Sequence, residues 1–171
     1  MSDFQSQIEG ERGKLKELLL QIPGFKGYIE MEDRRTADKL LRETIADRYQ
    51  EVIDRLSGLQ SDLVDQGALE WLDDLEAVVV KLRTFIDRIR NATYGYSSFF
   101  SAVKVDPEKL DKIYEYDLAL LDGISGLEAL LGELEEAGEE VQISETISDL
   151  KKLAAEIVKR GDQRSEVVTK E

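Results

Sequence analysis

Apolar residues recur every three or four positions along most of the chain, which is the spacing of an amphipathic α-helix. A sustained alternation of apolar and polar residues, the pattern of a half-buried strand, is absent from the sequence. The periodicity predicts helices over about 4–21, 31–66, 68–92 and 106–137, and a last one from about Ser144. We therefore expect an all-α fold, an antiparallel bundle of four to five helices with one long helix and short connections.

Glycine and proline mark where these helices begin and end. Pro23 and Gly24 end the first segment, Gly67 ends the second, and Pro107 follows an N-cap residue at the start of the fourth. The sequence beyond Gly161 is polar. We expect one helical-bundle domain over residues 1–160, followed by a frayed polar tail over 161–171.

Two polar features stand out on the predicted helices. The apolar row of the fourth helix is interrupted by Asp117. The long second helix carries acidic residues four positions before arginines, and these pairs are Glu30–Arg34, Asp38–Arg42 and Glu51–Arg55. This order favours weak ion pairs on a helix surface, so we expect these positions to face solvent.

Composition and charge narrow the functional classes. The chain has 171 residues, a net charge of −14, and neither histidine nor cysteine, which removes histidine-assisted nucleophiles, thiolates and the usual zinc ligands. Such acidity opposes nucleic acid as the main partner, because phosphate binding needs clustered lysine and arginine. No apolar run approaches the roughly 20 residues that span a bilayer, and Met1–Gln5 opens no secretory signal. We expect a cytoplasmic protein without a cofactor.

One enzymatic alternative comes from spaced acidic residues. The stretch Leu134–Glu139 resembles the first half of the signature of MazG-like nucleoside triphosphate pyrophosphohydrolases, in which paired carboxylates on two helices hold Mg²⁺. Under this alternative the metal ligands are Glu133, Glu136 and Glu139. The second half of the signature departs from the family pattern, because the next acidic residues have different spacing and Gly138 is expected to end the helix. With 37 acidic residues in the chain, such spacings also arise by chance.

Six of the twelve aromatic residues lie in two short predicted connections, where polar residues are the norm. The first connection carries Phe25 and Tyr28 and is followed by arginines; the second is rich in glycine and serine. Together they supply the candidate partner-binding residues Phe25, Tyr28, Arg34, Arg35, Tyr94, Tyr96, Phe99 and Phe100. Aromatic and arginine side chains dominate the energetics of many protein interfaces. Two other interpretations are that both connections cap the core, or that the basic third helix and its aromatic tip touch a membrane surface.

The same two stretches, Ile22–Tyr28 with the following Arg34–Glu43 and later Tyr94–Tyr96, resemble an uncharacterised set of small helical prokaryotic proteins. That resemblance implies a helical fold and a prokaryotic source, and it implies no activity. Heptad-like apolar rows on the second and third helices also allow self-association. We therefore expect a non-enzymatic interaction or scaffold protein that binds a protein partner through its aromatic connections.

Overall fold

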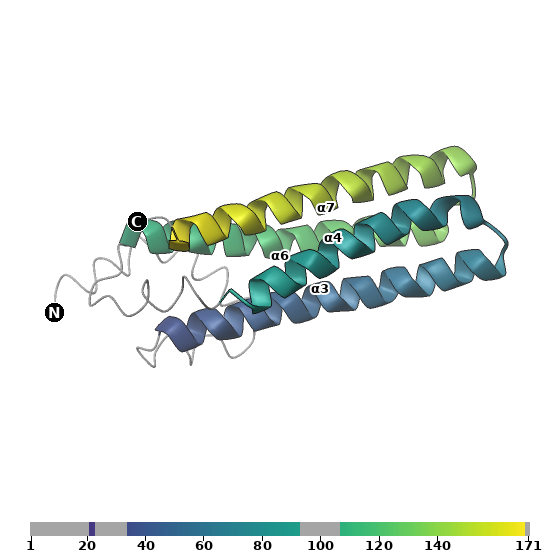
Figure 1. The fold of residues 1–171 in the computed structure, drawn as a ribbon. Helices are drawn as coiled ribbons and strands as arrows, with labels where there is room; N and C mark the ends of the chain where they lie inside the picture. The colour runs from purple at the N-terminus through teal and green to yellow at the C-terminus, as the bar shows by residue number, and fades with distance from the viewer. Residues whose placement is uncertain (1–20, 23–33, 93–106, 170–171) are drawn as a thin grey trace.

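The computed structural model describes residues 21–22, 34–92 and 107–169. Within these ranges it contains four long helices and no strand (Figure 1). The elements in chain order are α3 (Arg34–Asp65), the 3₁₀ turn η1 (Leu69–Trp71), α4 (Leu72–Arg90), α6 (Pro107–Glu136) and α7 (Glu140–Thr169). The prediction of an all-α helical bundle is confirmed. The first predicted helix lies outside the described residues, apart from its last residue, Gln21.

The helices form two hairpins that lie side by side. Residues 66–68 connect α3 to α4 through η1, and residues 137–139 connect α6 to α7; both connections lie at the same end of the bundle (Figure 1). We call this the hairpin end. At the opposite end, which we call the open end, α3 and α6 begin and α4 and α7 finish.

The order of the helices around the bundle is α3, α4, α7 and α6. The two helices of each hairpin run in opposite directions. This is shown by Arg42–Ile89 and Gln60–Glu76 between α3 and α4, and by Asp117–Arg164 and Gly126–Leu153 between α6 and α7. Between the hairpins the numbers rise together, as in Tyr49–Leu120 with Arg55–Glu135 and Asp74–Lys151 with Arg88–Asp162. The predicted antiparallel arrangement therefore describes the pairs within hairpins, whereas neighbours from different hairpins run in the same direction.

The long helix α3 ends where its sequence predicts. Gly67 has a φ of +74°, a left-handed conformation that glycine adopts without a Cβ clash. The Ala68 N–H donates to the Leu63 carbonyl at 2.9 Å, and the Gly67 N–H donates to the Val64 carbonyl at 3.0 Å. This pair of bonds is the Schellman motif, which satisfies the last carbonyls of a helix and turns the chain toward its partner.

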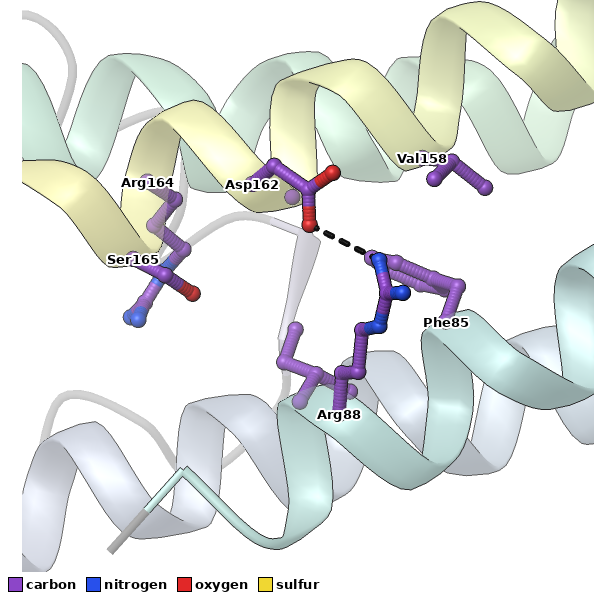
Figure 2. A pocket seen from close by; sticks show the side chains of 8 residues that line it. Phe85, Arg88, Val158, Asp162, Arg164 and Ser165 are labelled. Carbon is purple, nitrogen blue, oxygen red and sulfur yellow. Dashed lines mark hydrogen bonds and ion pairs between the residues drawn. The ribbon is translucent and has the colours of Figure 1, made fainter. Parts of the chain in front are cut away.

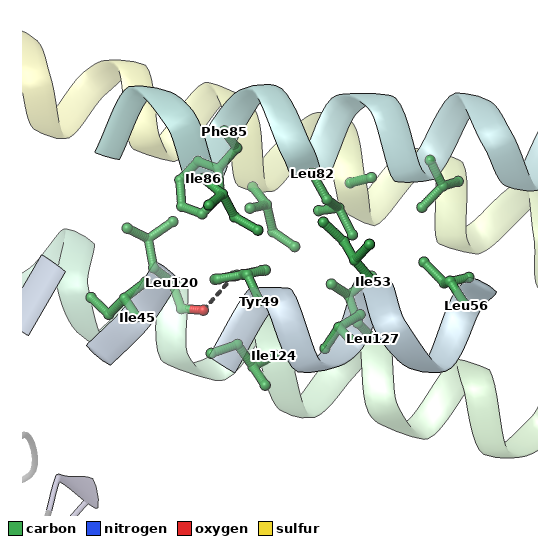
Figure 3. Packing of buried hydrophobic residues seen from close by; sticks show 14 of the residues in the cluster. Ile45, Tyr49, Ile53, Leu56, Leu82, Phe85, Ile86, Leu120, Ile124 and Leu127 are labelled. Atoms are coloured by element: carbon green, nitrogen blue, oxygen red, sulfur yellow. Dashed lines mark hydrogen bonds between the residues drawn. The ribbon is translucent and has the colours of Figure 1, made fainter. Parts of the chain in front are cut away.

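The core is a continuous column of aliphatic side chains from all four helices, with Tyr49 and Phe85 at its centre (Figure 3). The two rings meet edge to face, with centroids 4.9 Å apart. The buried Tyr49 hydroxyl donates to the main-chain carbonyl of Leu120 at 2.5 Å. A Cβ at Gly123 would lie 2.8 Å from that hydroxyl, so glycine at this position lets α6 approach the tyrosine.

The last helix differs from the prediction at both of its ends. It begins at Glu140, four residues before Ser144, and it continues to Thr169. The expectation of a frayed tail is therefore wrong over residues 161–169. The reason is tertiary contact: Arg164 and Val168 are buried among the other helices, and burial of this kind overrides weak local helix preference.

Candidate functional site

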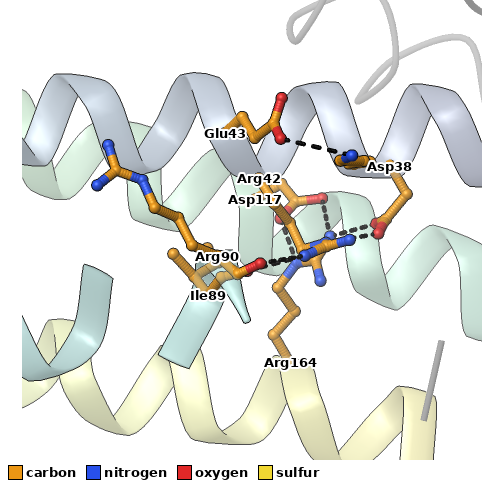
Figure 4. A network of polar contacts seen from close by, with 8 residues as sticks. Asp38, Arg42, Glu43, Ile89, Arg90, Asp117 and Arg164 are labelled. Carbon is orange, nitrogen blue, oxygen red and sulfur yellow. Dashed lines mark hydrogen bonds and ion pairs between the residues drawn. The ribbon is translucent and has the colours of Figure 1, made fainter. Parts of the chain in front are cut away.

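Four charged side chains are buried together at the open end of the bundle, where a hydrophobic layer would otherwise continue (Figure 4). They are Asp38 and Arg42 on α3, Asp117 on α6 and Arg164 on α7, and their exposed fractions are 7%, 4%, 0% and 1%. We call this group the ionic cluster. Charged residues are seldom buried to this degree unless they are paired, so the pairing defines the site.

Arg164 is the centre of the ionic cluster. Its Nε donates to Asp117 Oδ1 at 2.5 Å, and its Nη2 donates to Asp117 Oδ2 at 3.2 Å. The same Nη2 also donates to Asp38 Oδ1 at 2.6 Å. Because α3 and α7 are not neighbours in the bundle, this guanidinium reaches across the core and joins the two hairpins. A forked contact with a carboxylate is the geometry in which arginine binds most strongly.

Arg42 connects the ionic cluster to the fourth helix. Its Nε donates to Asp38 Oδ2 at 2.8 Å, and its Nη1 donates to the Ile89 carbonyl at 2.9 Å and the Arg90 carbonyl at 3.4 Å. These carbonyls belong to the last turn of α4. No following helical turn supplies N–H donors to them, and the helix end carries partial negative charge. All four helices are thus tied together at the open end.

The electrostatics of the ionic cluster are finely balanced. Two carboxylates face two guanidinium groups, and every buried side-chain nitrogen or oxygen in the described part of the chain has a hydrogen-bond partner. Burial raises the pKa of Asp117 to about 6, although the Arg164 charge opposes that rise. Buried ion pairs contribute little net stability compared with a well-packed apolar layer, yet removing one partner is costly. An arrangement of the helices that separated one of these charges from its partners would therefore be strongly disfavoured.

The sequence contained one signal of this site and one misleading expectation. Asp117 interrupts the apolar row of its helix, and this interruption marks the buried carboxylate. The Asp38–Arg42 pair was expected to face solvent, and that expectation is wrong because both residues point at α4 and α7. The other described pair, Glu51 and Arg55, is exposed as expected, and Arg55 binds Glu135 of α6. The remaining pair, which includes Glu30, lies outside the described residues.

The side chains of the predicted partner-binding residues lie outside the described part of the structure, although the backbone of Arg34 and Arg35 begins α3. These eight residues are Phe25, Tyr28, Arg34, Arg35, Tyr94, Tyr96, Phe99 and Phe100. Their attachment points are nevertheless defined. Residues 23–33 lead into the start of α3, and residues 93–106 join the end of α4 to the start of α6, so three of their four junctions lie at the open end (Figure 1).

The fourth junction is held against the body of the bundle. Ile22 is buried in the hydrophobic core, and Arg48 Nη2 donates to the main-chain carbonyl of Gln21 at 2.6 Å. Since Arg48 lies in the half of α3 nearer its beginning, the chain enters residues 23–33 from the open half of the bundle.

The alternative magnesium site is not assembled. Glu133 and Glu136 lie in the last turns of α6, Glu139 follows the end of that helix, and all three are exposed. No group of three acidic side chains within the described ranges is arranged to hold a metal ion. The helix ends before Glu139, so the spacing of three does not place these carboxylates on one continuous helix face.

A small depression lies beside the ionic cluster, between α4 and α7 (Figure 2). Phe85 and Gly161 are among its lining residues, and so are Arg88 and Asp162, which form an exposed ion pair of 3.1 Å. Its volume is about 10 Å³. That is about the space that one water molecule needs, so the depression does not accommodate a metabolite.

Across the described residues, no helix is both long and apolar enough to cross a bilayer. No protein-family model, curated protein or solved structure matches the chain. The resemblances noted in the sequence therefore stay predictions, and function is argued from the site itself.

Proposed function

We propose that this chain is a non-enzymatic interaction module of the cytoplasm, which binds a protein partner at the open end of its bundle. The binding residues are those of the two aromatic segments, with Phe99 and Phe100 in the second and Phe25 and Tyr28 in the first. One observation carries the proposal: both segments join the bundle at or toward the same end, next to the ionic cluster that ties all four helices there.

A rigid base with recognition residues on its connections is a common design for binding. Connections carry binding residues because they tolerate variation while regular elements hold their ends in place. Here the aliphatic column holds the hairpins together, and the ionic cluster fixes the helix ends from which the aromatic segments depart. Aromatic side chains anchored on such a base add contact area at low entropic cost, and arginines beside them add directed hydrogen bonds.

The proposal is tested by reversing the character of the second segment. The double substitution Phe99→Glu and Phe100→Glu is compared with wild type in affinity capture from native lysate. The matched control is Val141→Glu, because Val141 is an apolar residue at the hairpin end and is 68% exposed. We expect partner capture to be lost in the double variant and retained in the control, with unchanged helical circular dichroism in both.

Three outcomes contradict the proposal. If the double variant unfolds while the control does not, the two phenylalanines belong to the core. If both variants capture the same proteins as wild type, the second segment is not the binding surface. If wild type sediments with lipid vesicles and captures no protein, the membrane interpretation replaces the proposal. Sedimentation velocity of the purified chain identifies the case in which the partner is a second copy.

A further inference from the structure

The end of α7 is helical despite its sequence. Residues 162–169 contain aspartate, serine, two valines and threonine, which are among the poorer helix formers, and the helix has no basic residue in its last turn. Gly161 precedes them and further weakens the helix locally. We call residues 162–169 the latch. A segment that contradicts its local preference depends on tertiary contacts, and these can be identified.

The latch is held by buried, apolar and surface contacts. Its buried side chains are Arg164 and Val168. Val168 packs with Ile113 in a small apolar cluster, separate from the main core, to which Ala92 and Val167 add contacts. Asp162 forms an exposed ion pair with Arg88, which is of the kind that contributes little in water. The guanidinium of Arg164 supplies the buried ion pairs by which the latch joins α3 and α6, so we expect the order of the latch to depend on it.

The site that receives Arg164 has a definite chemistry. Without that side chain, two buried carboxylates, Asp38 and Asp117, face the single guanidinium of Arg42. The site then has an excess negative charge and unpaired acceptor oxygens arranged for a forked donor. A guanidinium meets both needs, whereas an ammonium supplies no planar fork. The neighbouring surface at Ile113 is aliphatic, so the arginine fits best when it is flanked by small apolar residues.

We propose that the latch occupies a guanidinium-binding site formed by Asp38 and Asp117, and that a partner helix carrying an arginine among small aliphatic residues displaces the latch there. Displacement of the latch by a partner rests on the proposed function, whereas occupation of the site by the latch does not. Displacement exchanges one arginine–carboxylate fork for another, so the buried carboxylates stay paired in both states. It also frees the last two turns of α7 at the end where the aromatic segments are attached.

Occupation of the site by the latch is tested by hydrogen exchange of the full-length chain. Arg164→Met removes the guanidinium, and Arg160→Met is the matched control on the same helix, where Arg160 forms a partly exposed pair with Glu156. We expect latch amides of Arg164→Met to exchange at close to unstructured rates, while amides over 147–157 stay at least 100-fold protected. Arg160→Met should change latch exchange less than threefold. Continued protection of the latch, or equal loss over 147–157, overturns the proposal.

The chemistry of the site is tested by rescue. In full-length Arg164→Ala at pH 8, millimolar ethylguanidinium should raise the melting temperature saturably, because a ligand that binds only the native state stabilises it. N-ethylurea, which is similar in shape and uncharged, should not. The response should vanish in Arg164→Ala/Asp117→Leu. Equal effects of the two compounds, or a response that survives the second substitution, would show that no guanidinium site exists.

Displacement is tested with a labelled peptide that copies residues 157–169. It should bind full-length Arg164→Ala at least tenfold more tightly than the same peptide carrying Arg164→Leu, as measured by fluorescence polarisation. Equal binding of the two peptides overturns the displacement step. The experiments separate the two ideas: if exchange and rescue succeed while partner capture by Phe99 and Phe100 fails, the proposed function is wrong and the latch remains.

Discussion

Substitution of Arg164 by methionine is the perturbation whose cost follows most directly from the geometry. Methionine approximates the aliphatic stem of arginine and removes only the charged fork. The change leaves two carboxylates, on Asp38 and Asp117, with the one guanidinium of Arg42 in a site from which water is excluded. Removing one partner of a buried ion pair typically destabilises a protein by about 3–5 kcal/mol.

That loss is large on the scale of this chain. Domains are stable by about 5–15 kcal/mol, and for 150–250 residues each kilocalorie per mole corresponds to roughly 2–4 °C in melting temperature. We therefore expect Arg164→Met to lower the free energy of unfolding by about 3–5 kcal/mol in urea denaturation at pH 7.5. Because the latch opens in this variant and water then reaches both carboxylates, about 3–5 kcal/mol is the upper limit of the loss, which equals the free energy of latch opening.

A second substitution distinguishes unpaired charge from lost packing. Leucine has a branched shape similar to that of aspartate. In the Arg164→Met background, Asp117→Leu leaves Asp38 and Arg42 as a neutral pair, with Arg42 Nε 2.8 Å from Asp38 Oδ2. We expect the double variant to recover at least about 2 kcal/mol of the loss, because no excess charge stays buried. A double variant that is less stable than Arg164→Met would refute the electrostatic reasoning and indicate that shape alone matters.

Three further results are expected. Gly161→Ala should destabilise the protein by about 1–3 kcal/mol in urea denaturation, because a Cβ there would lie 2.6 Å from Cε2 of Phe85. Gly58→Ala should stabilise it by up to about 1 kcal/mol, because nothing lies within 4 Å of a Cβ at that position. Similar effects at both sites would contradict the close packing of Gly161 against Phe85. Tyr49→Phe should cost about 0.5–1.5 kcal/mol for its lost hydrogen bond, and a neutral result would show that the bond contributes nothing. Because burial raises the pKa of Asp117 from 3.8 to about 6, the folded state holds a proton between these values that the unfolded chain releases. The stability that this bound proton contributes is fully present below pH 3.8 and is lost as the pH rises through 6. Wild type should therefore gain stability relative to Asp117→Asn as the pH falls from 7 to 5, by at most about 1.4 kcal/mol per pH unit. A relative loss over that range would mean that the pKa is lowered.

The helices were predictable from the sequence because their signals are local. Apolar residues at helical spacing, Pro107 at the first position of α6 and Gly67 after α3 mark elements that the structure contains. The order of helices around the bundle was not predictable, because apolar periodicity shows which face of a helix is buried but not which other helix packs against it. The sequence therefore held no signal for which helices from different hairpins become neighbours.

The ionic cluster shows where sequence reasoning lacks information. An acidic residue followed four positions later by an arginine is the same sequence pattern on a helix face exposed to solvent and on a helix face that another helix covers. The difference for Asp38 and Arg42 is made by Arg164, which lies more than 100 positions away in the chain. The polar residues after Gly161 gave no sign of helix, because the contact that orders them is tertiary.

Site-specific photo-crosslinking tests the central claim most directly. A benzophenone side chain is placed at Phe99 in one variant and at Val141, at the hairpin end, in another, and each is irradiated in native lysate. The account predicts a discrete protein adduct from position 99 that is lost when Phe100→Glu is added, and none from position 141. The same adduct from both positions, or from neither, would contradict the claim that the open end binds a protein partner.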